Sequence, residues 1–461
     1  MTRRFRCTVC GYVHVGDEPP DECPVCGAGR EAFVPEMEGS PTPAPVLAPA
    51  SVPSPDEETG PGLVVLGGGI AGLSAVEAAR DRSPDAVITL VHRETALPYY
   101  RLSLTRYLAG ALTKDHLQLR ARSWFEERRI RLVRAEARHL DRSRRLVVLD
   151  DGTMLPYRRL LVATGAHPYV PPIPGVRFPG VHVLRTIEDA DAILERARRG
   201  AHCVCIGGGL LGLETAGALA RRGLAVIVLE EAPRLLPRQL ARSAAARLAD
   251  HLGKLGIEVR TAVKVTEIEG DDSVRAVRSA DGSEMPADLV VIAAGVRPNV
   301  QLARSAGLAV NRGLVVDDGL QTNDPDVLAA GDVAEHRGIV WGLWTVAAEQ
   351  GALAGRAMAG AAVAYEGNPP ATYLKVVELP VFSIGRFEEE APADRVIERA
   401  DEARLVRILL RDGRVVGGNL VGDPTLAHAL QRAVQERLPF AAVPEFRFLA
   451  GGTKQEVGTQ G

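Results

Sequence analysis

Two glycine-rich turns constrain the fold of this 461-residue chain more than any other feature. The first, GGGIAG at 67–72, follows the apolar run at 63–66, and the second, GGGLLG at 207–212, follows the apolar run at 203–206. A helical pattern and a further apolar strand come after each turn. This strand–glycine–helix–strand unit is typical of nucleotide-binding α/β domains. The sequence therefore predicts two such domains, or one that interrupts the other.

The glycines of the pattern G-x-G-x-x-G have separate physical roles. The first permits a tight turn, the second lets the backbone approach a pyrophosphate, and the third allows close packing of the helix on the strand. The N-terminus of the following helix offers unpaired N–H groups to the phosphates. One match is weak, because glycine-rich turns also serve packing alone, but two complete units make that alternative a small one. We therefore predict cofactor contacts at Gly67, Gly69, Gly72, Gly207, Gly209 and Gly212.

A carboxylate follows the strand after each of the two helices, at Glu94 and at Glu230. A carboxylate at this position accepts hydrogen bonds from ribose hydroxyls. Glu230 should also repel a 2′-phosphate, which favours NADH over NADPH. The plain alternative for each acid is a solvated strand end, and it stays open for Glu94 because His92 and Arg93 crowd that position.

Four of the six cysteines lie within the first 26 residues, as Cys7-x-x-Cys10 and Cys23-x-x-Cys26. Paired C-x-x-C turns direct four thiolates at one point, which is what a tetrahedral zinc or iron site requires. A module of about 35 residues also needs such a metal, because it cannot supply a stable core alone. We predict these four cysteines as metal ligands. The spacing alone fits a zinc ribbon about as well as a rubredoxin.

The 31 prolines are unevenly spread, and the segment 37–62 is composed largely of Pro, Ala and Ser without a hydrophobic period. Such a segment cannot bury enough apolar surface to fold, and its prolines favour an extended chain. We therefore expect a tether between a small N-terminal module and a large body. The last ~90 residues alternate differently from the body and predict a small α+β domain.

Composition excludes some classes of partner. With 55 Lys plus Arg against 58 Asp plus Glu, the net charge of −3 gives no global electrostatic reason to bind nucleic acid or an anionic membrane. No apolar stretch reaches the ~18 residues that a membrane-spanning helix needs. The N-terminus shows no signal-peptide pattern, and the cysteine usage fits a reducing compartment, so we expect a cytoplasmic protein.

Residues 63–369 resemble the FAD-dependent pyridine nucleotide oxidoreductases, in particular the rubredoxin reductase and nitrite reductase large-subunit branch. Besides the two glycine turns, the matching segments are LPYYRLSLTRYLAG at 97–110, LLVATGAHPYVPPIPG at 160–175, AAGVRPN at 293–299 and AAGDVAE at 329–335. The resemblance implies FAD on the first turn and NAD(P)H on the second, with the second domain inserted into the first. It also implies cofactor contacts at Arg101, Thr164, Gly165, Gly295, Gly331 and Asp332.

The resemblance also implies two departures from related enzymes. The positions that carry redox cysteines in disulfide reductases and NADH oxidases hold none here. Cys203 and Cys205 alternate on a buried strand; we expect their side chains to lie on opposite faces and to pack in the core. In ferredoxin-reductase-like members a Lys pairs with the Glu that matches Glu214, near flavin N5. Here Arg106 takes the Lys position, and a guanidinium can pair with that carboxylate but will not shuttle a proton.

The segment CTVCGYVHVGDEPPDECPVCG at 7–27 resembles the rubredoxin-like domain of rubrerythrins. This resemblance implies one Fe(Cys)4 centre that cycles between the ferric and ferrous states, with Phe33 as a core aromatic. Combined with the flavoprotein body, it implies electron flow from NADH through FAD to the iron centre and on to a downstream acceptor protein. One alternative is a reductase of a separate ferredoxin-like, nitrite-reducing or quinone partner, with a zinc-bound docking module. A second is a non-enzymatic redox or iron sensor.

The expected architecture is α/β: two Rossmann-like three-layer domains for FAD and NAD, a C-terminal α+β domain, and an N-terminal rubredoxin-like metal module. We expect a monomer or a homodimer. The expected boundaries are 1–36 for the metal module, 37–62 for the linker, 63–182 and 296–369 for the FAD domain, 183–295 for the NAD(P)H domain and 370–461 for the C-terminal domain.

Overall fold

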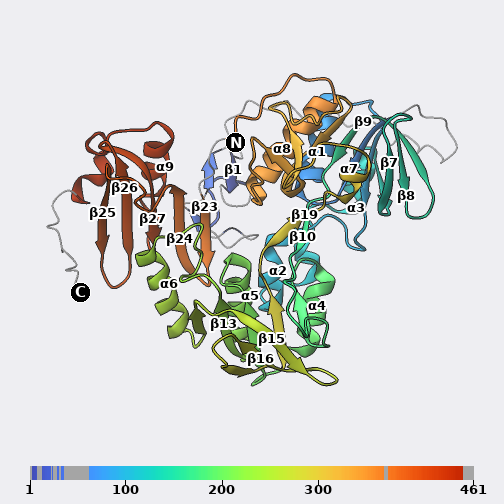
Figure 1. Cartoon of the computed structure of the whole chain (residues 1–461). Coiled ribbons are helices and arrows are strands. Elements are labelled where there is room, and N and C mark those ends of the chain that lie inside the picture. Colours follow the sequence, from blue (N-terminus) through green and yellow to red (C-terminus); the bar gives the residue numbers. More distant parts are fainter. Residues whose placement is uncertain are drawn as a thin grey trace. The chain divides into compact units, whose positions relative to one another are not determined.

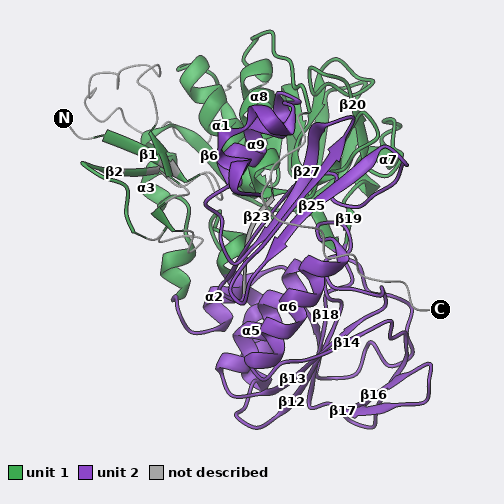
Figure 2. Ribbon diagram, turned by 90° about the vertical axis from the view of Figure 1, so that its left-hand side faces the viewer, with its two compact units in different colours: residues 1–103, 113–167, 296–367 green, residues 104–112, 168–295, 368–461 purple. Residues whose placement is uncertain are grey.

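The computed structural model describes residues 3–7, 13–21, 23, 29–30, 33–35, 62–367 and 372–449. The chain divides into two compact units, each assembled from separate stretches of sequence (Figure 2). Unit 1 comprises 1–103, 113–167 and 296–367, and unit 2 comprises 104–112, 168–295 and 368–461. Apart from Gly62, the expected linker lies outside the described residues.

The main sheet of unit 1 has the strand order β6-β5-β4-β9-β8-β7, and β21 also pairs with β9 (Figure 1). Its central strand β4 carries four successive buried residues, Leu63 to Leu66, as expected for a parallel strand covered on both faces. The strands β7, β8 and β9 form an antiparallel extension. The strands are β4 (Gly62–Leu66), β5 (Ile88–His92), β6 (Ile130–Arg134), β7 (Ala137–Asp141), β8 (Leu146–Leu149), β9 (Met154–Val162) and β21 (Val327–Ala329).

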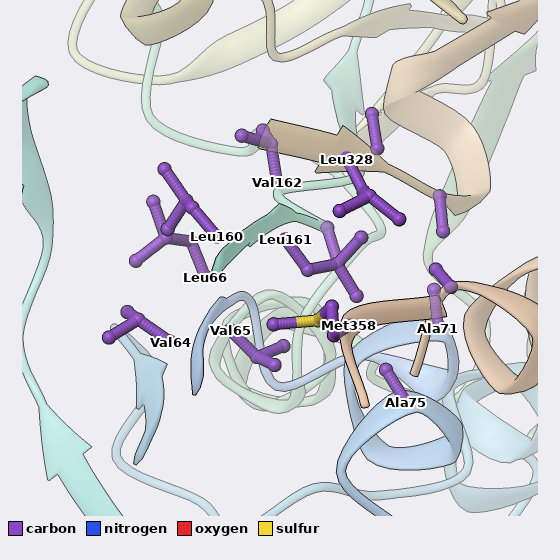
Figure 3. Packing of buried hydrophobic residues seen from close by; sticks show 14 of the residues in the cluster. Val64, Val65, Leu66, Ala71, Ala75, Leu160, Leu161, Val162, Leu328 and Met358 are labelled. Atoms are coloured by element: carbon purple, nitrogen blue, oxygen red, sulfur yellow. The ribbon is translucent and has the colours of Figure 1, made fainter. Parts of the chain in front are cut away.

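Helices α1 (Ile70–Arg82) and α8 (Trp344–Met358) pack closely against each other in unit 1. The contact depends on missing side chains: a Cβ at Gly351 would overlap the carbonyl oxygen of Ala71, and one at Gly355 would overlap that of Ala75. Figure 3 shows both alanines beside the side chains of β4 and β9 and Met358 of α8. This core holds the first glycine turn rigidly between β4 and α1.

Short elements complete unit 1. A three-stranded antiparallel sheet of order β2-β1-β3 forms the described part of the N-terminal module. The remaining elements are β1 (Arg3–Cys7), β2 (Val13–Gly16), β3 (Phe33–Pro35), η2 (Arg101–Ser103), η3 (Lys114–Leu117), α3 (Arg122–Glu127), β10 (Ala166–Pro168), β19 (Val296–Pro298), α7 (Gln301–Ser305), β20 (Leu314–Val316), η4 (Gly331–Val333) and β22 (Ala334–His336).

Unit 2 contains a five-stranded parallel sheet of order β11-β18-β12-β13-β14, which holds the second glycine turn. An antiparallel sheet of order β15-β16-β17 lies within the same stretch of chain. The elements are α2 (Leu104–Leu108), β11 (Val181–Val183), α4 (Ile187–Arg196), β12 (His202–Ile206), α5 (Leu210–Arg221), β13 (Ala225–Glu230), α6 (Arg242–Lys254), β14 (Glu258–Thr261), β15 (Val265–Gly270), β16 (Val274–Ser279), β17 (Glu284–Pro286) and β18 (Leu289–Ile292).

The expectation for Cys203 and Cys205 is wrong in one respect. Their Sγ atoms lie 3.9 Å apart, on the same face of β12, because residues two apart along a strand project to the same side. Both side chains are fully buried, as a core role requires. The neighbouring Cys205 thiol, together with burial, raises the pKa of Cys203 well above its usual range, so this thiol stays protonated and unreactive.

The C-terminal part of unit 2 is a five-stranded antiparallel sheet of order β23-β24-β27-β26-β25, with α9 packed on β24 and β27. The buried amide of Asn419 joins this sheet to the preceding domain: its Oδ1 accepts from Ala241 N, and its Nδ2 donates to the Gln239 carbonyl. The elements are β23 (Thr372–Val376), β24 (Leu379–Gly385), β25 (Asp394–Ala400), β26 (Leu405–Arg411), β27 (Arg414–Val421), α9 (Ala427–Gln435), η5 (Phe440–Ala442) and η6 (Pro444–Leu449).

The fold is thus mixed α/β, as the sequence predicts. Strand β11 spans the expected boundary at residue 182 and pairs in parallel with β18. Across the described ranges, no helix combines the length and the apolar content that crossing a bilayer requires.

Candidate functional site

In the first glycine turn, two glycines are required by close packing, and a third would have open space around a Cβ. Gly67 has a φ of +122°, and a Cβ there would overlap the carbonyl oxygen of Ala163. A Cβ at Gly72 would overlap the carbonyl oxygen of Gly67. A Cβ at Gly69, the N-cap of α1, would meet nothing within 4 Å. The turn therefore leaves a space above Gly69, next to the N-terminus of α1, that fits a pyrophosphate.

The second turn repeats this geometry in unit 2. A Cβ at Gly207 would overlap the Ala293 carbonyl, and one at Gly212 would overlap the Gly207 carbonyl. Gly209, the N-cap of α5, again has nothing within 4 Å of its missing Cβ. The same three roles thus occur at the same three positions of both fingerprints, and each unit offers one open cradle at a helix N-terminus.

Glu230, the acid at the end of the second fingerprint, is hydrogen-bonded to the glycine turn of the same fingerprint. Its Oε2 accepts a hydrogen bond from Gly208 N at 2.6 Å, and its Oε1 accepts one from Ala232 N at 2.7 Å. These two bonds fix the carboxylate at the end of β13, beside Gly208 of the turn. A carboxylate fixed there could accept from ribose hydroxyls through its remaining lone pairs.

Glu94 already has two internal partners in unit 1. Its Oε2 accepts from the Tyr99 hydroxyl at 2.7 Å, and its Oε1 accepts from Arg101 Nη2 at 2.6 Å. Burial disfavours the charge of Arg101, but Glu94, Tyr99 and the more distant Asp332 outweigh this effect and raise the pKa of Arg101. Arg101 is therefore a fixed cation close to the acid of the first fingerprint. Glu94 therefore orients the Arg101 guanidinium, and this role does not depend on a bound ribose.

Three hydrogen bonds with Asn299 hold Thr164 and Gly165 in place. The Asn299 side chain donates to the Thr164 carbonyl at 2.7 Å, and Asn299 N donates to the Gly165 carbonyl at 2.9 Å. Thr164 Oγ1 in turn donates to the Asn299 carbonyl at 3.1 Å. Gly295 has a φ of +104° and open space at its missing Cβ. Site prediction missed Asn299, although it ends the AAGVRPN motif.

Gly331 and Asp332 begin the short helix η4. Gly331 N donates to Gln350 Oε1 of α8 at 2.9 Å, and Gln350 is buried. Gln350 also hydrogen-bonds the buried Tyr365, whose pKa is raised to about 12 by burial and by Glu349. Helix α8 therefore fixes the loop that carries Asp332, through the hydrogen bond between Gln350 and Gly331. Sequence reasoning missed Gln350, because a lone glutamine within a helix carries no pattern.

Arg106 and Glu214 lie on α2 and α5, and these two helices pack against each other in unit 2. Glu214 Oε1 accepts a hydrogen bond from Val377 N at 2.8 Å. Val377 and Glu378 form the tight turn between β23 and β24, with φ values of 48° and 71°. A Cβ at Gly217 would lie 2.8 Å from Val377, so this turn packs closely on α5. The C-terminal domain thus reaches Glu214, for which the resemblance implies a catalytic role near the flavin, with Arg106 as its partner.

The described part of the N-terminal module presents two predicted metal ligands. Cys7 ends β1, Cys23 follows β2 along the chain, and both side chains are fully buried. Phe33 is buried beside them, as expected for a core aromatic. Cys10 and Cys26 lie outside the described residues. Two C-x-x-C pairs supply soft sulfur donors that fit iron or zinc.

Comparison with known families now identifies the body of the chain. The model of the pyridine nucleotide-disulphide oxidoreductases matches residues 61–351. The chain belongs to this family. The rubrerythrin rubredoxin-like domain matches residues 5–34, and the rubredoxin NAD+ reductase C-terminal domain matches residues 370–438.

Similar proteins include reductases of this family. Nitrite reductase [NAD(P)H] of Bacillus subtilis is 36% identical over 402 residues; the match covers 86% of this chain but only 50% of that protein. NADH-rubredoxin oxidoreductase of Clostridium acetobutylicum is 29% identical over 82% of this chain and 95% of its own length. The crystal structure of NADH:rubredoxin oxidoreductase from the same species superposes with a TM-score of 0.69 at 27% identity, covering 83% of this chain and 97% of that one.

Pyridine nucleotide-disulphide oxidoreductases bind FAD and NAD(H), which fits the two open glycine cradles. The disulphide of the family name has no counterpart between residues 62 and 367 of this chain. The two cysteines in that range, Cys203 and Cys205, are buried within the sheet that holds the second fingerprint. A reduced flavin in this chain therefore needs an electron acceptor other than a neighbouring disulphide.

Proposed function

We propose that this protein is an NADH-dependent FAD oxidoreductase that passes electrons to its own Fe(Cys)4 centre and then to an external acceptor protein. One observation carries the proposal: a flavin reductase body, a rubredoxin reductase C-terminal domain and a rubredoxin-like module occur in a single chain. The chain spans about half the length of the nitrite reductase that it matches, so it need not share that protein's reaction.

The first fingerprint supplies a fitting site for FAD. The open space at Gly69 and the N-terminus of α1 would receive the pyrophosphate, with Gly331 and Asp332 beside it. Arg101 would add a fixed positive charge, and Thr164 and Gly165 would present backbone groups held by Asn299. Bound there, FAD accepts a hydride and returns electrons one at a time, which suits a one-electron iron centre.

The second fingerprint would bind NADH. Gly209 would leave room for the pyrophosphate, and Glu230 would accept from the ribose hydroxyls of the adenosine half. The fixed carboxylate of Glu230 would repel the 2′-phosphate of NADPH, which makes NADH the preferred coenzyme. Arg106 would pair with Glu214 and orient it, and neither group needs to move a proton during hydride transfer.

Anaerobic stopped-flow spectroscopy of the purified protein tests this function. NADH should bleach the flavin first and the ferric-thiolate bands afterwards, in one mixing experiment without added carrier. Bleaching of the flavin alone, with the ferric bands unchanged, would show that the internal relay is wrong.

A second candidate function follows from the metal site. The C-x-x-C spacing fits zinc as well as iron, and a zinc-bound module would serve only to dock a separate partner of the flavoprotein. Metal analysis separates the two candidates: one iron per chain supports the relay, and one zinc per chain excludes it.

A further inference from the structure

An apolar cluster joins the N-terminal module to the rest of unit 1. The module contributes Phe5, Cys7, Cys23 and Phe33, all buried. The body contributes the buried Tyr100 and the partly buried Leu119 and Trp344. The rings of Tyr100 and Trp344 stack at a centroid distance of 5.0 Å and an interplanar angle of 19°. We call the three body residues the aromatic platform.

The platform stands on the segments that frame the predicted flavin site. Tyr100 lies between Tyr99 and Arg101, which both bind Glu94. Trp344 is the first residue of α8, the helix whose Gln350 holds Gly331. Leu119 N donates to the Pro98 carbonyl at 3.0 Å, which ties its loop to the same motif. The platform therefore belongs to the segments that frame the predicted flavin site and shares one apolar cluster with two predicted metal-ligand cysteines.

We propose that Tyr100, Leu119 and Trp344 form the docking surface on which the fused metal module receives electrons. This inference rests on the proposed function and names the contact through which it works. Cys7, Cys23 and the stacked rings of Tyr100 and Trp344 belong to one apolar cluster. Such a cluster excludes water, which would shorten the electron path between the two centres and lower the solvent rearrangement that each transfer requires.

The electron count closes over two transfers at this surface. A flavin that has accepted one hydride would lose two electrons in succession and release one proton to water, and the ferric centre would gain one electron and become ferrous at each transfer. A single module must therefore give up its first electron to the external acceptor before it accepts the second. Docking is accordingly reversible in this proposal, and the module returns to the platform once in each half-cycle.

Leu119→Glu tests the docking surface, because it places a charge among apolar side chains and leaves both stacked rings, Tyr100 and Trp344, in the sequence. Met154→Glu is the matched control: Met154 is 60% exposed on β9 of the same unit and lies outside the cluster. Hydrogen exchange of the holoprotein measures docking without any redox step. Amides of residues 98–103 and 113–119 should exchange about tenfold faster in the Leu119 variant, and their exchange should be unchanged in the Met154 variant.

Stopped-flow measurements on the same two variants supply the kinetic test. Flavin bleaching by NADH should keep its wild-type rate in both, whereas bleaching of the ferric bands should slow about tenfold only for Leu119→Glu. Trp344→Leu, which keeps the site apolar but removes the stack, should slow the second step while leaving exchange protected.

The docking surface is wrong if Leu119→Glu exchanges and transfers electrons like the wild type. If wild-type protein never reduces its metal centre, the proposed function fails; the exchange experiment then still decides whether the module docks on the platform. The two failures are therefore distinguishable.

Discussion

At positions 69 and 209 a side chain would project into empty space, although the neighbouring fingerprint glycines admit none. Both residues have extended backbone, with φ of −76° and −79°, so an added Cβ would meet neither strain nor neighbours. Nothing within the described chain accounts for glycine at these positions. A ligand that approaches the backbone closely would account for it.

This difference predicts the behaviour of two matched variants. Gly69→Val should fold with the thermal stability of wild-type apoprotein yet lose FAD, because only the bound cofactor competes for that space. Gly209→Val should keep FAD but weaken NADH binding about tenfold or more. Flavin content by absorbance and NADH titration measure the two effects. Loss of FAD from the Gly209 variant, or retention of FAD by the Gly69 variant, would contradict the assignment of the two cradles.

Glu230 carries the prediction for coenzyme choice. Glu230→Gln should raise the KM for NADH about tenfold, because an amide cannot accept from both backbone N–H groups that fix the carboxylate. The preference for NADH over NADPH should narrow, since the repulsive charge is lost. Glu258→Gln, on the adjacent strand β14, removes an equal charge outside the fingerprint and should change neither value. Equal preference ratios in wild type and Glu230→Gln would exclude Glu230 as the discriminator.

The hydrogen bonds of Asp318 predict that the free energy of unfolding decreases at acidic pH. Hydrogen bonds from Arg337 and His336 lower its pKa to about 2. A carboxyl group with a lowered folded pKa stabilises the protein above the unfolded value of about 4, and this contribution fades as the pH falls toward about 2. Asp318→Asn should therefore lower the urea midpoint at neutral pH, and the difference from wild type should shrink below about pH 4. A difference that stays constant down to about pH 2 would refute this.

At the scale of elements, the close contact of α1 and α8 sets the stability of unit 1. Gly351→Ala should destabilise the protein by about 1–3 kcal/mol, because the new Cβ would overlap the Ala71 carbonyl and force the helices apart. Gly253→Ala provides the control in α6, where the new Cβ would meet nothing within 4 Å. It should be neutral or stabilise by about 0.5–1 kcal/mol. Urea unfolding of both variants gives the comparison, and similar effects at the two sites would rule out this packing argument.

Local pattern was enough to predict some elements. The apolar runs before and after each glycine turn predict β4, β5, β12 and β13, because a buried parallel strand must be apolar on both faces. The glycine spacing predicts the two cradles because the turn is too tight for a side chain: a Cβ at Gly67 or Gly72 would overlap a backbone carbonyl oxygen. Fold class and family follow from these repeated units.

Contacts between distant elements could not be predicted in this way. The Val377 turn reaches Glu214 from a different domain, and its positive φ values belong to residue types that rarely adopt them. Asn299 and Gln350 act through single hydrogen bonds, which leave no periodic signal in sequence. The error at Cys203 and Cys205 arose from the strand period itself, which places alternate residues on one face.

At the scale of the whole molecule, the proposed relay would make electron delivery independent of the encounter of two molecules, because the module belongs to the same chain. A tethered module has an effective concentration near ~mM for a linker of suitable length. The rate constant for bleaching of the ferric bands should therefore not change when the protein is diluted tenfold. A rate that rises in proportion to protein concentration would instead mean that one molecule reduces the module of another.

The route of the chain through its sheets has a consequence for synthesis. Strand β9 ends at Val162, yet its parallel neighbour β21 begins only at Val327, after all five strands of the β12 sheet. During synthesis, all strands of the β12 sheet therefore leave the ribosome before strand β21 and helix α8, which complete unit 1. We expect a chain that ends at residue 300 and has left the ribosome to bind NADH but no flavin, because its β12 sheet has all five strands and its β4 sheet lacks β21.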